Sequence, residues 1–510
     1  MDNSASQTKA EAVRNYEIGS KQDIIEFSVN LPEENVSRIL SASASVVIDK
    51  HEALLGELSF SGEACLNIIY SLDDGTILSN KSCQNFSRKI EDIMFDPSIL
   101  VSILPKVVDV SVEQGNGNAI KVKITLENEF SILKNQEISL FQNQENDVFV
   151  KESEMQLTKQ KERGCAEVKQ TSLFETKLPV GKILNITSGA ILSKADALDG
   201  TIIFEGETIT RLLYSTADDR PLLVSLFNKD LFREEVENSN VAEENVIEAY
   251  AVVLENQIEE TIDEETKNVE ISIPVKICYD VFESNTLTVV DDAYSTQTEI
   301  NLSTEAFITT NVVGTEIFTN KIDGNISLGE DAPRIDKVLA IDGVCVNPTN
   351  KKIENEEYVA DGTIRFNLIY LNDEEKNISS VSLEFPYQIA EKINKKNVVN
   401  SKSANQIIDL DATVKRGREI YIDGKLKTSL WLVEEVEKAV VSSATKGEAL
   451  KTKDGALEIY FANEGQTFWD VAKDLKVSQE LLKQQNAEIV EPFDKNEKIV
   501  FFDQYQIEIE

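Results

Sequence analysis

One pattern occurs three times in this chain of 510 residues, at a spacing of about 150 residues. Each copy has a proline, then a basic residue followed by a β-branched residue and leucine, then a tyrosine 32 or 33 positions after the basic residue. A glycine stands eight positions before each tyrosine. The glycine and tyrosine pairs are Gly62 and Tyr70, Gly206 and Tyr214, and Gly362 and Tyr370. Agreement at this many positions indicates one structural unit repeated in tandem.

The residues that lead to each tyrosine alternate between apolar and polar. From Leu58 to Tyr70, every second residue is apolar or glycine, and the residues between them are mostly polar. The same alternation runs from Ile202 to Tyr214 and from Tyr358 to Tyr370. A period of two predicts half-buried strands of antiparallel sheets, and a central glycine indicates a bend, a bulge or a close neighbour. The sequence therefore predicts a mainly β protein of tandem β-sandwich-like domains, in which the segment from proline to leucine is a short turn or helix.

Charge excludes some classes of partner. The chain has 51 basic and 90 acidic residues, a formal net charge of −39, and the acidity is spread along it. Such a surface repels phosphate backbones and anionic lipid headgroups, so we expect no nucleic acid partner and no membrane insertion. Residues 1–20 lack an apolar region and no apolar run approaches 18 residues. We therefore expect a soluble protein in the cytoplasm of the cell that makes it.

The cysteine and histidine content argues against metal sites and catalysis. The five cysteines are widely spaced without a Cys-x-x-Cys pair, and His51 is the single histidine. Because these residues supply too few ligands for most metal sites, we expect no metal and no cofactor. We also expect free thiols instead of a disulfide framework. His51 has no nucleophile motif beside it and is predicted to lie in a solvent-facing loop, so we expect that the protein is not an enzyme.

The last fifty or so residues have a different pattern. Gly465 suits a turn with positive φ, and Thr467 can cap the helix that follows it. Ser478 can cap a second short helix, and the apolar run 498–502 can close the unit as a strand. The sequence therefore predicts a β-α-α-β module over residues 456–505.

This module resembles LysM in its run Gly465–Gln–Thr–Phe–Trp–Asp–Val–Ala472 and in the later Asn486. The resemblance implies a docking module with a groove between two loops, which binds N-acetylated sugars in some members and protein in others. Gln466 replaces the usual aspartate, which favours protein. Trp469 is either part of the module's own core or a contact at the groove. The candidate groove residues are Gly465, Gln466, Thr467, Phe468, Trp469, Asn486 and Ile489.

The threefold repeat resembles the SPOCS domain (DUF3794) over residues 20–440. The resemblance rests on the strand from glycine to tyrosine and on the upstream element, in which a proline precedes the basic, β-branched and leucine residues. Several SPOCS repeats followed by one LysM module are typical of spore-coat morphogenetic proteins of endospore-forming bacteria. The resemblance implies a scaffold made in the mother cell, which acts at the forespore surface. It also implies that the LysM module docks on the coat-basement morphogenetic ATPase or on another spore-coat protein.

The predicted organisation follows from these patterns. Residues 1–15 are expected to be disordered, the repeats to cover 16–150, 165–305 and 306–440, and a flexible linker to cover 441–455 before the module. The charged stretch Lys151–Gly164 is a predicted linker, and Glu255–Lys267 a predicted solvated loop.

Two functions remain open at this point. The first is a non-enzymatic scaffold or adaptor of the endospore coat or envelope, whose LysM-like module binds a protein. The second is a protein that grips peptidoglycan or N-acetylglucosamine polymers of the spore cortex or cell wall through the same module. The missing apolar leader region and the altered loops favour the first.

Overall fold

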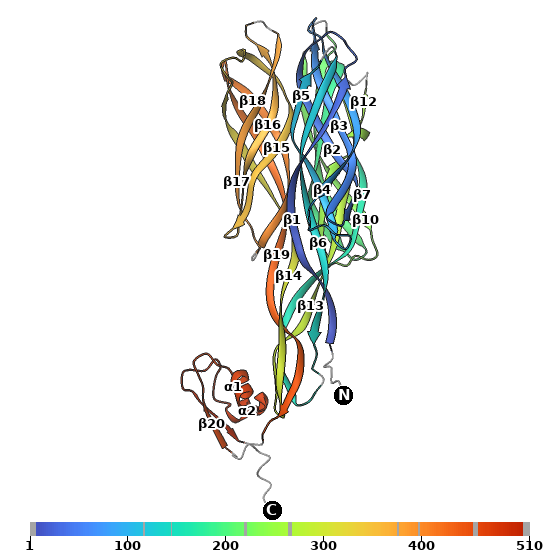
Figure 1. Ribbon diagram of the computed structural model, residues 1–510. Helices are drawn as coiled ribbons and strands as arrows, with labels where there is room; N and C mark the ends of the chain where they lie inside the picture. The colour runs from blue at the N-terminus through green and yellow to red at the C-terminus, as the bar shows by residue number, and fades with distance from the viewer. Residues whose placement is uncertain are drawn as a thin grey trace, which may run out of the picture.

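The computed structural model describes residues 7–115, 118–143, 145–218, 222–263, 268–374, 377–395, 398–451 and 457–502. The chain forms an elongated body of twisted sheets, a stalk of long strands that leaves one end of the body, and a small module beside the far end of the stalk (Figure 1). The mainly β fold and the small C-terminal β-α-α-β module agree with the sequence prediction.

Each repeat consists of two antiparallel three-stranded sheets, and repeat 2 adds one short strand. In repeat 1 the sheet orders are β2-β3-β4 and β1-β6-β5. The strands of repeat 1 are β1 (Gln7–Asn30), β2 (Val36–Leu54), β3 (Glu57–Leu72), β4 (Ile77–Glu91), β5 (Leu100–Gln114) and β6 (Ala119–Phe141).

Repeats 2 and 3 follow the same strand order, with β8-β9-β10 and β15-β16-β17 as their first sheets. Repeat 2 comprises β7 (Val148–Glu175), β8 (Val180–Leu198), β9 (Thr201–Thr216), β10 (Leu223–Glu237), β11 (Val246–Val253), η1 (Glu255–Gln257), β12 (Glu259–Ile262) and β13 (Asn268–Ser295). Repeat 3 comprises β14 (Thr298–Ser327), β15 (Ile335–Glu354), β16 (Glu357–Asn372), β17 (Ile378–Lys392), β18 (Val398–Arg416) and β19 (Glu419–Ala449).

The two sheets of each repeat enclose one apolar core. In repeat 1 the alternating residues of β3, such as Phe60 and Leu66, pack with Ile124 and Leu126 of β6. Repeats 2 and 3 have equivalent cores around Phe204 and Phe366. Full burial of one such side chain stabilises the fold by roughly 1.5–3 kcal/mol. The period-two pattern of the sequence therefore corresponds to the sandwich-facing side of the middle strand in each repeat.

The repeated tyrosine tethers the chain that enters each repeat's first sheet. The ring of Tyr370 is buried, and its hydroxyl donates to the carbonyl oxygen of Pro333 at 3.3 Å. The hydroxyl of Tyr214 donates to the carbonyl of Leu178, and that of Tyr70 to the carboxylate of Glu33. These bonds explain the spacing between proline and tyrosine. The segment from proline to leucine, predicted as a turn or helix, instead enters an extended strand in all three repeats.

The three repeats meet along a common axis. Two positions of each repeat point away from the sandwich core and pack together between the repeats. One is the leucine that follows the basic and β-branched residues, and the other is the residue before the repeated tyrosine. This axial core consists of Leu40, Ile69, Leu184, Leu213, Leu223, Ala340 and Ile369, with Leu339 packed against it. A polar layer lies beside it, in which Asp342 accepts hydrogen bonds from Ser41 at 2.5 Å and Asn185 at 2.8 Å. Because all three repeats contribute, the body is one packed unit.

Buried ion pairs also join the repeats. The carboxylate of Glu129 in β6 lies between the ammonium groups of Lys106 and Lys351, which belong to repeats 1 and 3. Burial opposes the charged form of Glu129, but the two lysines outweigh it and lower its pKa to about 2. Lys402 of repeat 3 pairs with Glu248 of repeat 2, and both side chains are buried.

The stalk corrects the predicted domain boundaries. Strands β1 and β6, β7 and β13, and β14 and β19 extend beyond the sandwiches and pair as three long ladders. Lys151–Gly164, predicted as a linker, lies within β7, because Met155 and Leu157 alternate with its charges and pack inside the stalk. The repeats therefore run 7–141, 148–295 and 298–449 instead of 16–150, 165–305 and 306–440.

The predicted disordered and linker segments are partly strand. Residues 7–15 belong to β1, and residues 441–449 of the predicted flexible linker 441–455 belong to β19. Residues 1–6 and 452–456 lie outside the described residues. In the predicted solvated loop 255–267, Glu255 lines a cavity of about 330 Å³ between the repeats, and burial raises its pKa to about 7. Residues 264–267 of that loop also lie outside the description.

Two further sequence predictions were wrong. Cys65 and Cys83 form a disulfide, because the pairing of β3 with β4 places them directly opposite each other. Cysteines that are separated in sequence can thus be neighbours across strands. His51 lies in strand β2 rather than in a loop, although it is exposed as predicted, and its Nε2 is 2.8 Å from the carbonyl oxygen of Val101.

We predict that Gly362→Ala destabilises repeat 3 by about 1–3 kcal/mol, the usual cost of overpacking. A Cβ at this position would lie closer to the carbonyl oxygen of Asn347 than van der Waals contact allows. Gly329→Ala is the matched control, because a Cβ there meets no atom within 4 Å. Urea unfolding of the two variants measures the difference, and equal midpoints would refute the close-neighbour explanation.

Stability should also fall in acid through Glu129. Because its folded pKa of about 2 is below the usual glutamate pKa of 4.5, the ion pair stabilises the fold above pH 4.5. This contribution is lost as the pH falls from 4.5 to about 2. Glu129→Gln should cost about 3–5 kcal/mol at pH 7 and flatten that part of the pH profile, whereas Glu235→Gln at an exposed pair should change the free energy of unfolding by less than about 0.5 kcal/mol. An unchanged pH profile in Glu129→Gln would contradict this assignment.

Candidate functional site

The C-terminal module is built as the sequence predicts. Strand β20 (Leu457–Phe461) pairs antiparallel with β21 (Lys498–Phe502), and helices α1 (Phe468–Leu475) and α2 (Gln479–Gln485) lie between them in the chain. Gly465 turns the chain with a φ of 84°. Thr467 is the N-cap of α1 and forms a capping box with Asp470, and Ser478 caps α2.

The two loops of the predicted groove are hydrogen-bonded to each other. The amide of Gly465 donates to the carbonyl of Phe493 at 2.9 Å, and the amide of Phe493 donates to the carbonyl of Gln466 at 2.8 Å. The amide of Phe468 donates to the carboxylate of Glu491 at 2.8 Å. The structure thus brings Gly465, Gln466 and Phe468 together, but their backbone groups bind the opposite loop.

Several predicted groove residues hold the module itself together. The side chain of Asn486 is buried, donates to the carbonyls of Leu482 and Val500, and accepts from the amide of Val500. It therefore pins the end of α2 to β21. Ile489 packs against the module core, and the ring of Phe468 meets the edge of Phe493 in that core.

Trp469 lies at the junction between the module and the stalk. The side chain is 5% exposed, and its Nε1–H donates to the Asp292 carboxylate at 2.9 Å. Its ring meets Tyr294 edge-on with centroids 5.1 Å apart. Trp469 thus belongs to a core that the module shares with the stalk. The sequence analysis offered a residue of the module's own core or a contact at the groove, and neither describes this position in full.

Further contacts fix this junction. Lys473 of α1 donates to both oxygens of Asp292, at 2.7 and 2.8 Å, and the hydroxyl of Tyr294 donates to the carbonyl of Val477 at 2.7 Å. Burial opposes the charged form of Asp292, but the hydrogen bonds from Lys473 and Trp469 outweigh it and lower its pKa. Sequence reasoning missed Asp292 and Tyr294, because no pattern in strand β13 indicates a partner about 180 residues away.

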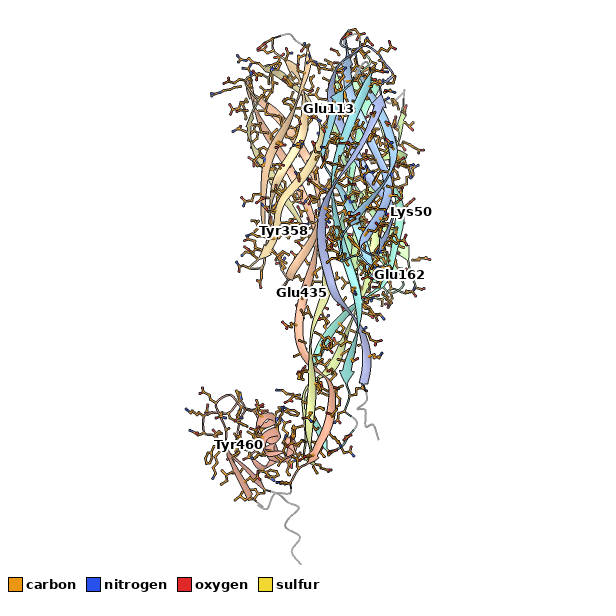
Figure 2. All side chains as sticks on the ribbon, viewed as in Figure 1. Lys50, Glu113, Glu162, Tyr358, Glu435 and Tyr460 are labelled. Atoms are coloured by element: carbon orange, nitrogen blue, oxygen red, sulfur yellow. A yellow bond between two sulfur atoms is a disulfide. The ribbon has the colours of Figure 1, made fainter. Side chains whose placement is uncertain are left out.

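The module exposes an apolar face on the side of its sheet opposite the helices. Leu457, Ile459 and Phe461 of β20 are 51%, 48% and 63% exposed. Phe502 of β21 pairs with Leu457 and is 47% exposed. We call these four residues the outer sheet face. The intervening Tyr460, labelled in Figure 2, and Ile499 pack against the helices. Apart from Glu458, the residues of β20 are apolar or aromatic, which was the sequence signal for a strand with two apolar sides.

Comparisons with known proteins add no family assignment. A scan against protein-family models, a search of curated proteins and a search of solved structures each found no match. Among the helices of the described residues, none has the length and apolar character needed to cross a membrane.

We predict that Asp292→Ala loosens the module from the stalk. The substitution removes the charged acceptor of Trp469 and Lys473. Hydrogen bonds to charged groups contribute about 1.5–3 kcal/mol, so the docking equilibrium should shift by about tenfold or more. Iodide quenching of tryptophan fluorescence should then increase, because Trp469 becomes accessible while Trp431 stays buried.

Asp291→Ala is the matched control. Asp291 is the neighbour of Asp292 but bonds to Ser153 within the stalk. Quenching in this variant should equal that of the unsubstituted protein. Identical quenching in Asp292→Ala would show that the junction does not depend on this carboxylate.

Proposed function

We propose that this protein is a non-enzymatic scaffold or adaptor in the assembly of the endospore coat or envelope. Its LysM-like module docks on a coat-morphogenetic protein, which the SPOCS and LysM resemblance implies is the coat-basement ATPase or another spore-coat protein. The protein acts in the mother cell at the forespore surface. The body and stalk hold the module at a set distance from other contacts of the scaffold.

The exposed outer sheet face is the observation that carries this proposal. Its four large apolar side chains are close together on a two-stranded sheet, and contiguous apolar surface of this kind marks interaction sites. Aromatic side chains such as Phe461 are enriched at the buried centres of protein–protein interfaces. The outer sheet face therefore suits a protein partner.

The other two sides of the module are already engaged within the chain. Helix α1 packs against the stalk through Trp469 and Lys473. The loops around Gly465 and Phe493 bind each other through backbone hydrogen bonds. This arrangement favours docking through the outer sheet face over sugar binding between the loops.

Charge narrows the chemistry of the partner. From Gly455 to the end, the chain has 12 acidic and 5 basic residues. An acidic module attracts a partner whose contact surface is apolar at its centre and basic at its rim, and such complementarity mainly raises the association rate and the specificity. We therefore expect binding that slows as the salt concentration rises.

The stalk supports a scaffolding role mechanically. Because Asp292 and Tyr294 bind the module to the stalk, it is held at the end of the stalk instead of on a free tether (Figure 1). A fixed orientation reduces the entropy lost when a partner binds.

We predict that Phe461→Ser weakens binding of the full chain to the purified coat-basement ATPase of the same genome by at least about tenfold, or about 1.4 kcal/mol. Biolayer interferometry with immobilised ATPase measures the affinity. Val490→Ser is the matched control, because Val490 is also exposed but lies on the loop side of the module. Equal loss in both variants, or loss only in Val490→Ser, would move the docking site to the loops.

A parallel assay tests the alternative. N-acetylglucosamine oligomers and purified peptidoglycan should not retain the full chain. A different result would overturn the protein-docking proposal in favour of glycan binding between the loops. In that result the glycans retain the chain, Gln466→Ala abolishes the retention, and Phe461→Ser leaves it unchanged.

A further inference from the structure

The chain contains two pairs of cysteines that face each other across neighbouring strands. Cys65 of β3 lies opposite Cys83 of β4, and these two form a disulfide. Cys165 of β7 lies opposite Cys278 of β13 in the same way, but both are free thiols. The second pair belongs to repeat 2 and is not part of the docking module.

We propose that Cys165 and Cys278 form a thiol–disulfide exchange site that reacts with a small-molecule disulfide and closes as a second cross-strand disulfide. The geometry for closure is present already, because the strand register places the two residues side by side. The two thiols are also hydrogen-bonded to each other. Closure therefore needs no change in the pairing of β7 with β13.

The surroundings assign different roles to the two thiols. Cys165 is exposed, and the hydrogen bond from Cys278 lowers its pKa to about 7. Lys276 and Arg163 contribute smaller electrostatic stabilisation of its thiolate. The pKa of Cys278 is raised by the same hydrogen bond and by burial. Cys165 is therefore the nucleophile, because the thiolate is the form that attacks a disulfide, and Cys278 is the resolving thiol.

The exchange proceeds in two balanced steps. The thiolate of Cys165 attacks one sulfur of the small disulfide, whose sulfur–sulfur bond breaks, and a first small thiolate leaves. Cys278 then gives up its proton to that leaving thiolate and attacks the sulfur of Cys165 in the mixed disulfide. A second small thiolate leaves and takes a proton from water. Two protein thiols are thus oxidised to one disulfide while one small disulfide is reduced to two thiols.

The remaining free cysteine provides an internal comparison. Cys345 is buried, and burial raises its pKa to about 12. It has no cysteine opposite it, because its partner across β15 and β16 is Arg365. Cys345 should therefore stay reduced under conditions that oxidise the Cys165–Cys278 pair.

The test uses the full chain with the Cys65–Cys83 disulfide intact, incubated with oxidised glutathione at pH 7.5. Peptide mass spectrometry should find the 165 and 278 peptides linked, with no glutathione retained and Cys345 unmodified. Cys278→Ser should instead accumulate glutathione on Cys165. Cys165→Ser should remain unmodified at Cys278.

Three results would overturn the proposal. The first is a stable glutathione adduct on Cys165 in the unsubstituted chain without a link to Cys278. The second is reaction of Cys165 no faster than that of Cys345. The third is a Cys278→Ser variant that takes up no glutathione although its unfolding midpoint is unchanged. The first measurement needs no substitution, so it stands even where a variant fails to fold.

Discussion

The packing of the same apolar positions from three repeats around one axis determines the rest of this structure. Ile69, Leu213 and Ile369 each precede the repeated tyrosine and point away from their own sandwich core. Each repeat therefore has a second apolar surface that it cannot bury alone. Its burial between repeats makes the body a single unit, and it aligns the three long strand ladders so that they continue together as one stalk.

Buried charges make the arrangement specific. Pairing of Glu129 with lysines from two repeats, and of Lys402 with Glu248, requires the repeats to meet in one orientation. Buried ion pairs contribute little net stability compared with apolar residues, but a misplaced neighbour would leave a charge without its partner. The strands of the stalk continue from the repeats, so their positions follow from this orientation. Asp292 at the end of β13 binds Trp469 and thereby sets the position of the module.

Local structure could be predicted from the sequence, but little of the packing between distant parts of the chain could. Strand alternation, the turn at Gly465 and the cap at Thr467 were predictable, because each depends on residues nearby in the chain. For the central glycine the sequence left a bend, a bulge and a close neighbour open, and the structure shows a close neighbouring backbone. The Cys65–Cys83 disulfide was not, because strand register decides it. The stalk was missed because its charged outer residues resemble a linker, although Met155 and Leu157 show the alternation.

The candidate site shows the same division. The β-α-α-β order and the turn at Gly465 followed from the sequence, whereas the hydrogen bonds between Gly465 and the opposite loop needed the structure. The role of Asn486 inside the module and the junction of Trp469 with Tyr294 needed the structure. Sequence distance gives no sign of a contact between α1 and the end of β13, and a LysM-like pattern alone directs attention to the loops instead of the outer sheet face.

The central claim is that the module docks on protein through its outer sheet face. Hydrogen–deuterium exchange of the full chain, free and saturated with the coat-basement ATPase, tests this most directly. The account predicts slower exchange in β20 and β21 of the bound protein, with no change in the loops 463–467 and 487–495. Protection of those loops with unchanged exchange in the two strands would contradict it.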